Sequence, residues 1–267
     1  METAYSCDTG LLRALNEDTV LCTRLDLETH LGVISAGLFT VADGMGGHNA
    51  GEVASDLATR TFHVECISRL LDRPAAPPLS ILSDAFSKAN RSVLEAASDR
   101  DLQGMGTTLT AALVIGSDMF VAHIGDSRCY IINERETIQV TKDHSVVQQL
   151  VDAGIVTSEE AKTHPRKNEI TRVLGYSEDA APDLHHIKLY AGDQILLCTD
   201  GLCGVLATEK ISETVRSSNN LNQSCIELTA QAYLAGGPDN ISVVIVKPDN
   251  LPSWHALITA HTTLRTV

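Results

Sequence analysis

The sequence predicts an α+β fold in which antiparallel strands are covered by helices. Between residues 108 and 141, several apolar runs of strand length follow one another with only short polar turns between them. Such short connections favour antiparallel pairing, because parallel strands need long crossovers. Two consecutive amphipathic segments, at about 49–71 and 80–96, have helical length and must cover an apolar surface. At 267 residues, the chain is long enough for one large domain with a sizeable core.

The N-terminal part is predicted to contain an edge strand, a loop and the two helices. Residues 1–12 form the expected edge strand, residues 24–36 the loop, and residues 38–42 a buried strand. Ser80 is expected to cap the second helix. The core-facing side of the first helix is predicted from apolar residues at helical spacing, namely Val53, Leu57, Val64, Ile67 and Leu71. The corresponding residues of the second helix are Leu82, Phe86, Ala89, Val93 and Ala96.

The rest of the chain alternates strands, turns and short helices. Strands are predicted at 108–115, 119–124, 129–132, 137–141 and 241–246, and a hairpin at 186–190 and 194–198. Helices are predicted after Ser145, near 208–216 and near 221–234, and Thr157 begins a capping-box pattern. The polar segment 155–182 contains few large apolar residues, which is typical of a lid or binding loop.

Composition excludes several classes of function. The formal net charge is −14 and a basic stripe is missing, so we expect no nucleic-acid partner. Seven scattered cysteines without a Cys-x-x-Cys pair indicate neither a zinc knuckle nor a disulfide framework, and they favour a reducing, cytoplasmic location. The N-terminus does not have the pattern of a signal peptide, and no apolar run reaches membrane-spanning length, so we expect no membrane association.

Aspartates recur where apolar runs meet turns. Asp43, Asp126 and Asp200 each stand beside a glycine at the end of an apolar run, and Asp239 stands just before the strand 241–246. The end of one antiparallel strand lies beside the start of the next. We therefore expect Asp43, Asp200 and Asp239 to meet at one edge of the sheets.

Clustered carboxylates repel one another in a low dielectric, and cations placed among them would stabilise the arrangement. All-oxygen ligands favour Mg²⁺ or Mn²⁺. Two such ions bridged by Asp43 would activate a water and neutralise a phosphoryl group, while Glu17 and Asp18 would face a metal. Arg13 would grip the phosphate in a bidentate fork. The hypothesis is metal-assisted hydrolysis of a phosphoester; ordinary turn chemistry at these aspartates is the alternative.

The ordered set of motifs resembles that of the bacterial metal-dependent protein phosphatases, the type 2C serine/threonine phosphatases. Its matching elements span roughly residues 5–246. They are Arg13-x-x-Asn16-Glu17-Asp18, Val41-Ala42-Asp43-Gly44-Met45-Gly46-Gly47, Gly106-Thr107-Thr108, Gly125-Asp126-Ser127-Arg128, Asp143-His144-Ser145, Leu174-Gly175, Leu197-Cys198-Thr199-Asp200-Gly201-Leu202 and Asp239-Asn240-Ile241-Ser242.

The resemblance implies a four-layer α-β-β-α sandwich, with two antiparallel sheets flanked by helix pairs. It implies a phosphatase domain over residues 1–247 with a variable flap at about 155–182, and a C-terminal tail at 248–267. The implied activity is hydrolysis of phosphoserine and phosphothreonine in proteins by direct attack of a metal-bound water. The implied partners are such phosphoproteins and a cognate serine/threonine kinase, and the implied state is a monomer.

The same resemblance implies a centre of two Mn²⁺ or Mg²⁺ ions. In this pattern Asp43 bridges both ions, the Gly44 carbonyl binds one of them, and Asp200 and Asp239 bind the other. Its catalytic residues are Arg13, Asp43, Asp200 and Asp239, with Arg13 binding the substrate phosphate. Glu17 and Asp18 act mostly through metal-bound waters, and Asp126 with Asp200 matches a weaker third metal position.

One position departs from eukaryotic relatives, in which a histidine taken as the general acid stands where this chain has Met45. Methionine cannot donate a proton. His48 is expected to be exposed or to cap a helix, and His123 to be a hydrogen-bonded core residue. Two other functions stay open at this point. They are a catalytically silent module that binds phosphoproteins and a hydrolase of small phosphoesters.

Overall fold

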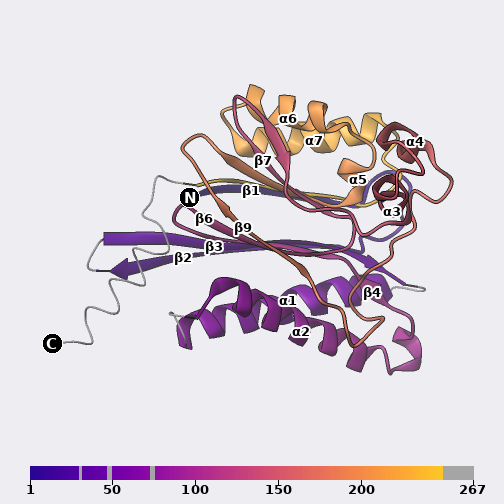
Figure 1. Cartoon of the computed structure of the whole chain (residues 1–267), viewed down its shortest axis with the longest axis horizontal. Helices are drawn as coiled ribbons and strands as arrows, with labels where there is room; N and C mark the ends of the chain where they lie inside the picture. Colours follow the sequence, from indigo (N-terminus) through magenta and orange to yellow (C-terminus); the bar gives the residue numbers. More distant parts are fainter. Residues whose placement is uncertain (30–31, 47–49, 73–75, 249–267) are drawn as a thin grey trace.

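The computed structural model describes residues 1–29, 32–46, 50–72 and 76–248. In this part of the chain, two antiparallel sheets stack face to face (Figure 1). One sheet has the order β1 (Glu2–Asp8), β11 (Ile241–Lys247), β10 (Gln194–Cys198), β7 (Arg128–Ile132) and β8 (Thr137–Gln139). The other has the order β2 (Asp18–Thr29), β3 (Gly32–Met45), β5 (Leu109–Ile115), β6 (Asp118–Ile124) and β9 (Asp183–Lys188), and the short strand β4 (Gly106–Thr107) pairs with the end of β3.

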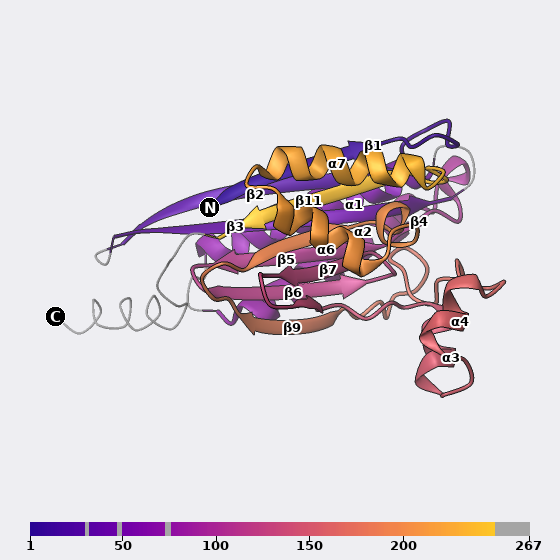
Figure 2. The same ribbon diagram turned by 90° about the horizontal axis from the view of Figure 1, so that it is seen from above.

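Helices cover the outer face of each sheet. Figure 1 shows α1 (Ala50–Asp72) and α2 (Pro78–Ala96) below one sheet, and α6 (Thr208–Ser217) and α7 (Leu221–Leu234) above the other. The remaining helices are short, namely a 3-10 turn at Arg100–Leu102, α3 (Val146–Asp152), α4 (Ser158–Thr163) and α5 (Asp200–Cys203). Figure 2 shows α3 and α4 projecting from one end of the sandwich. The predicted α-β-β-α architecture is therefore confirmed.

Burial on both faces explains why the central strands are continuously apolar. All residues of β5 and β6 are buried, and so are those of β11 except Lys247. Side chains such as Phe39, Val121 and Val244 fill the space between the sheets. Separate apolar clusters lie under the α1–α2 pair and under the α6–α7 pair. Strands buried on both faces need apolar residues at nearly every position.

The predicted loop at 24–36 is wrong. The structure extends β2 and β3 through this region, with pairing from Asp18 opposite Asp43 to Thr29 opposite Gly32. Arg24 and Asp26 are exposed while Leu25 packs partly against the core. Alternation of exposed and partly buried residues is typical of an edge strand with one solvated face. The polar residues of that face make the segment resemble a loop in sequence.

The predicted core-facing side of α1 is only partly confirmed. Val53 and Ile67 pack against the core. Val64 and Leu71 are 70% and 64% exposed. The buried side instead carries mostly small residues at four-residue spacing, namely Ala50, Ala54, Ala58, Phe62 and Cys66. Small side chains let the helix approach the sheet closely, whereas hydrophobic periodicity favours the large ones. The second helix buries Leu82, Phe86, Ala89 and Val93 as predicted.

Two local predictions near turns fail as well. Ser80 does not cap α2, because Pro77 is the N-cap residue and the helix begins at Pro78. Residues 186–190 and 194–198 do not form a hairpin, since β9 pairs with β6 while β10 pairs with β7 and β11. At residues 189–193 the chain crosses from one sheet to the other. The glycine-containing turn of this crossing has the same sequence pattern as a hairpin turn.

The predicted starts of two short helices are confirmed. Ser145 caps α3, and Thr157 forms a capping box with Glu160 at the start of α4. No helix in the described ranges is long and apolar enough to cross a bilayer. His48 and the tail beyond residue 248 lie outside the described residues.

Candidate metal centre and phosphate site

The predicted acidic residues gather at one end of the two sheets. Asp43 lies near the end of β3, directly opposite Asp18 at the start of β2. Asp200 follows β10, and Asp239 stands just before its neighbour β11. Asp126 lies in the turn between β6 and β7. Five segments of the chain thus bring their carboxylates to one edge.

Close backbone packing holds this edge together. The Gly44 N–H donates to the Glu17 carbonyl at 3.0 Å, and a Cβ on Gly44 would lie 2.0 Å from the carbonyl oxygen of Gly51. A Cβ on Gly201 would similarly lie 1.8 Å from the carbonyl oxygen of Asn240. Any larger residue at these two positions would push apart the segments that carry the acidic groups.

Hydroxyl groups fix individual acidic residues. The Thr199 hydroxyl donates to Asp18 Oδ2 at 2.8 Å and accepts from the Ser242 N–H at 3.0 Å. The Thr108 hydroxyl accepts from the Asp43 N–H at 2.9 Å. Thr199 follows β10 and accepts from Ser242 of β11, so it links Asp18 to the strands next to Asp200 and Asp239. Neither Thr199 nor Thr108 is predicted from the sequence to be a positioning residue, although both stand beside an acidic motif.

Burial and mutual repulsion favour the protonated forms of these carboxyl groups. Burial, and then the charges of Asp200 and Asp239, raise the pKa of Asp18 to about 7 against the lowering effect of its hydroxyl partners. Burial and the charge of Asp200 raise the pKa of Asp126 to about 8. Burial followed by repulsion from the other four aspartates raises the pKa of Asp43 well above its usual value.

Several oxygens of this cluster are suited to a cation. Asp18 Oδ1, Asp126 Oδ1 and Asp200 Oδ1 are buried and have no hydrogen-bond partner in the described part of the chain. Within the same residues, no three acidic, histidine or cysteine side chains close around a single ion position. The oxygen-rich, open arrangement fits hard divalent ions that also bind water and a backbone carbonyl such as that of Gly44.

Arg13 lies in the loop between β1 and β2, next to the acidic edge. Its Nη2 donates to Asp239 Oδ2 at 2.7 Å, and its side chain is 49% exposed. The hydrogen bond to Asp239 is the main cause that raises the pKa of Arg13, so the guanidinium stays charged. This pair engages Nη2 and leaves the other guanidinium nitrogens for a phosphate, which matches the fork geometry of arginine.

Asn240 positions the Arg13 loop. Its Oδ1 accepts from the Glu17 N–H at 2.8 Å, and its Nδ2 donates to the carbonyls of Thr9 and Leu15, each at 2.9 Å. The resemblance to the phosphatase family implies that Asn240 supports Asp239 and nearby water. The structure shows that it ties both ends of the loop that carries Arg13.

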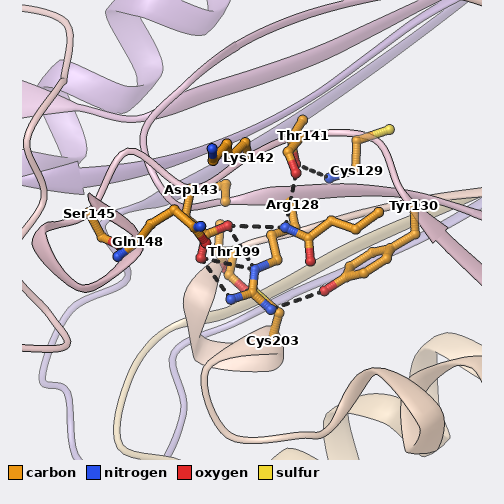
Figure 3. Close-up of polar contacts among 12 residues, drawn as sticks. Arg128, Cys129, Tyr130, Thr141, Lys142, Asp143, Ser145, Gln148, Thr199 and Cys203 are labelled. Atoms are coloured by element: carbon orange, nitrogen blue, oxygen red, sulfur yellow. Dashed lines mark hydrogen bonds and ion pairs between the residues drawn. The ribbon is translucent and has the colours of Figure 1, made fainter. Parts of the chain in front are cut away.

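Arg128 fixes the turn that carries Asp126. Its Nε donates to both carboxylate oxygens of Asp143, at 2.9 and 3.1 Å, and its Nη2 donates to Asp143 Oδ2 at 2.7 Å. Its Nη1 donates to the Tyr130 hydroxyl at 3.2 Å (Figure 3). The bidentate pair joins the start of β7 to the segment before α3.

A second support for this turn comes from His144, which the sequence left unassigned. His144 Nδ1 accepts from the Gly125 N–H at 3.0 Å, and its Nε2 lies 3.1 Å from Asp183 Oδ2 and 2.6 Å from Arg172 Nη1. His123 stacks on His144 and hydrogen-bonds Thr110, and burial lowers the pKa of His123 to about 3. The prediction that His123 is a core residue is confirmed.

A four-layer sandwich with a cation-compatible acidic edge beside a guanidinium defines a class of metal-dependent phosphoester hydrolases. Comparison with known protein families shows which family of this class the chain belongs to. The model of the Protein phosphatase 2C family matches residues 9–241. The chain belongs to this family, as its sequence motifs imply.

Known proteins agree with this assignment. The serine/threonine protein phosphatase PstP of Mycobacterium tuberculosis is 40% identical over 244 residues, covering 91% of this chain and 44% of PstP. This chain therefore spans less than half the length of that relative. The serine/threonine phosphatase Stp of Listeria monocytogenes is 34% identical over 254 residues, covering 93% of this chain and 96% of Stp.

A solved structure shows the same fold. The crystal structure of the PstP catalytic domain in complex with two manganese ions is 38% identical and aligns with a TM-score of 0.75. The alignment covers 91% of this chain and 96% of that domain.

Proposed function

We propose that this chain is a metal-dependent serine/threonine protein phosphatase. The observation that carries the proposal is the set of buried, unpartnered carboxylate oxygens of Asp18, Asp126 and Asp200 at the edge where Arg13 lies. Unpaired buried acids are costly in a fold unless a cation offsets them. The two manganese ions of the PstP structure support the same assignment.

We infer the following metal ligands. Asp43 would help to hold two Mn²⁺ or Mg²⁺ ions, because its carboxyl group lies among the four other aspartates of the edge, whose charges raise its pKa. The Gly44 carbonyl contributes to one ion, while Asp200 and Asp239 hold the other. Glu17 and Asp18 act mostly through bound waters, and burial raises the pKa of Glu17. Asp126 with Asp200 forms a weaker third position, which fits their mutual repulsion.

When bound, the two ions would supply an activated water and would offset charge on the phosphoryl group. The chain's own residues bind and orient the substrate. Arg13 holds the non-reacting phosphate oxygens, and Asp239 and Asn240 keep Arg13 in place. Met45 cannot protonate the leaving serine or threonine oxygen, so a water or another group supplies that proton.

We also propose the cellular setting. The substrates are proteins phosphorylated on serine or threonine by a cognate kinase, and the phosphatase acts in signalling as a cytoplasmic monomer. The cysteines of the described residues are free thiols, which fits a reducing compartment. Residues 1–247 constitute the phosphatase domain with a flap at about 155–182, and residues 248–267 a tail.

Hydrolysis of a phosphothreonine peptide, measured with Mn²⁺ and with a chelator, tests the proposal. The expected result is phosphate release that needs Mn²⁺ and that falls at least about 100-fold in Asp239→Asn. The matched control is Asp56→Asn, which breaks an exposed ion pair with Arg60 on α1. Absence of phosphate release from the metal-loaded protein refutes the proposal. Peptide binding without release would identify a silent binding module, and release only from small phosphoesters would identify a hydrolase of that class.

A further inference from the structure

A pocket of about 300 Å³ lies beside the acidic edge, under the base of the flap. Met45 and Ile124 from the sheet form one side of it, and Ile170, Val173 and Tyr176 from the flap form another. None of these residues belongs to the proposed metal ligands. The volume is at the low end of ligand pockets, which suits a single side chain better than a large molecule.

The pocket and the metal edge share the same strands. Met45 stands two residues after Asp43 at the end of β3, and Ile124 stands two residues before Asp126 at the end of β6. An extended peptide advances about 3.3 Å per residue. A phosphorylated residue bound at the acidic edge therefore places a neighbouring residue of the substrate within reach of the pocket.

A backbone ladder holds the flap side of the pocket in place. Met45 pairs with Gly106 in β4, and Thr107 exchanges hydrogen bonds of 3.1 and 2.9 Å with Leu174. The Tyr176 ring packs over Gly106, where an added Cβ would lie 2.7 Å from the ring. Its hydroxyl donates to the Gly104 carbonyl at 3.2 Å. Tyr176 is thus fixed although it is 60% exposed.

The charges around the pocket disfavour an acidic occupant. Arg172 also lines it, but its guanidinium donates to Asp183 Oδ1 at 2.7 Å and to the carbonyl of Ala181. The exposed carboxylate of Asp179 stands at the same pocket. The other lining residues are Thr171, Ser177 and six apolar residues, among them Met45. Methionine adapts to occupants of different shape.

We propose that this pocket is a specificity subsite that binds an apolar side chain of the substrate, close in sequence to the phosphorylated serine or threonine. The subsite rejects acidic side chains at that position. Met45 forms part of its wall. This inference rests on the proposed phosphatase function and specifies the class of phosphoprotein that the enzyme hydrolyses fastest.

A peptide series tests the subsite with the full chain and Mn²⁺. Each peptide carries one phosphothreonine in an alanine background, with leucine or glutamate placed in turn at the positions near it, and an aryl phosphate serves as a substrate without flanking residues. At one position or more, kcat/KM for leucine is expected to exceed that for alanine by about tenfold, and glutamate to be the poorest.

Two variants connect the preference to the pocket. Tyr176→Ala is expected to reduce the leucine-to-alanine ratio at that position to about twofold. Tyr190→Ala is the matched control, because Tyr190 is 75% exposed and lies between β9 and β10, outside the pocket. Thr171→Lys adds a cation at an exposed position of the lining and is expected to raise kcat/KM for the glutamate peptide about fivefold. A gain of this kind cannot result from misfolding.

The outcomes separate the two proposals. Hydrolysis of the peptides without any leucine preference overturns the subsite and leaves the phosphatase function standing. A preference that survives Tyr176→Ala and does not respond to Thr171→Lys assigns recognition to another surface and also overturns it. Failure to hydrolyse both the peptides and the aryl phosphate refutes the phosphatase function, and the subsite with it.

Discussion

The acidic edge is predicted to destabilise the metal-free protein, and Asp126→Asn removes part of this cost. Asp126 is 8% exposed, and its Oδ1 has no hydrogen-bond partner in the described residues. Burial and the charges of Asp200 and Asp143 raise its pKa to about 8 from 3.8. An amide of the same shape carries no charge and can donate to a neighbouring carboxylate.

The expected change in unfolding free energy follows from the raised pKa of Asp126. Each pKa unit corresponds to about 1.4 kcal/mol, so keeping Asp126 protonated in the folded protein at neutral pH, where the unfolded chain ionises it, costs several kcal/mol before the protein relaxes. Structural relaxation, water and coupling among the aspartates lower this cost. We therefore expect Asp126→Asn to raise the unfolding free energy of the chelated protein by about 1–3 kcal/mol at pH 8.

Urea unfolding in the presence of a chelator, across pH 5 to 9, measures this effect. Because the folded state of the wild type holds the Asp126 proton to a higher pH than the unfolded state, it binds more protons between pH 3.8 and about 8. Wild-type stability therefore falls as pH rises through this range, and the slope is shallower in Asp126→Asn. Mn²⁺ at 100 times its dissociation constant should restore about 2.7 kcal/mol to the wild type and less to the variant.

The exposed control Asp56→Asn should change the unfolding free energy by less than about 0.5 kcal/mol. If Asp126→Asn instead lowers the stability of the chelated protein at pH 8, the carboxylate contributes favourable contacts that outweigh repulsion. That result would refute the electrostatic account of the acidic edge.

Three further substitutions test the elements that position the site. Asp143→Ala leaves Arg128 without its bidentate partner and should lower the unfolding free energy, measured by urea titration, by about 3 kcal/mol. An unchanged urea midpoint would show that the ion pair is dispensable. Gly201→Ala drives a Cβ toward the Asn240 carbonyl and should abolish Mn²⁺-dependent phosphate release, so normal turnover would contradict the packing argument. Thr157→Ala removes a helix cap from the flap and should cost about 1 kcal/mol in thermal unfolding, with phosphate release from an aryl substrate as the check that the site is intact.

The sequence predicts the acidic edge better than it predicts the surrounding pairings. Asp43, Asp200 and Asp239 stand at strand ends, and antiparallel geometry brings such ends together whichever strands pair. The β9–β10 segment shows the limit of this reasoning. Its turn at Gly192 has φ of +93°, as a hairpin turn would, yet its two strands join different sheets. Only long-range packing decides that outcome.

The buried side of α1 is predicted only in part, for a related reason. Hydrophobic periodicity favours Val64 and Leu71, but the sheet packs against the stripe that includes Ala54 and Ala58. Alanine contributes little to a hydrophobic pattern, although it allows the closest approach of helix to sheet. Hydrogen bonds from residues such as Thr199 and His144 are likewise invisible in sequence, because their partners are distant in the chain.

The two-residue strand β4 connects the chemistry of the site to its proposed selectivity. The Thr108 N–H donates to the Asp43 carbonyl at 2.9 Å, next to Thr107, whose hydroxyl donates to the same carbonyl, also at 2.9 Å. Thr107 also pairs with Leu174 at the base of the flap. The backbone that sets the position of Asp43 therefore also sets the position of Tyr176 across Gly106. Substitutions of the pocket residues between 170 and 180 can therefore alter the proposed subsite while this ladder keeps the acidic edge in place.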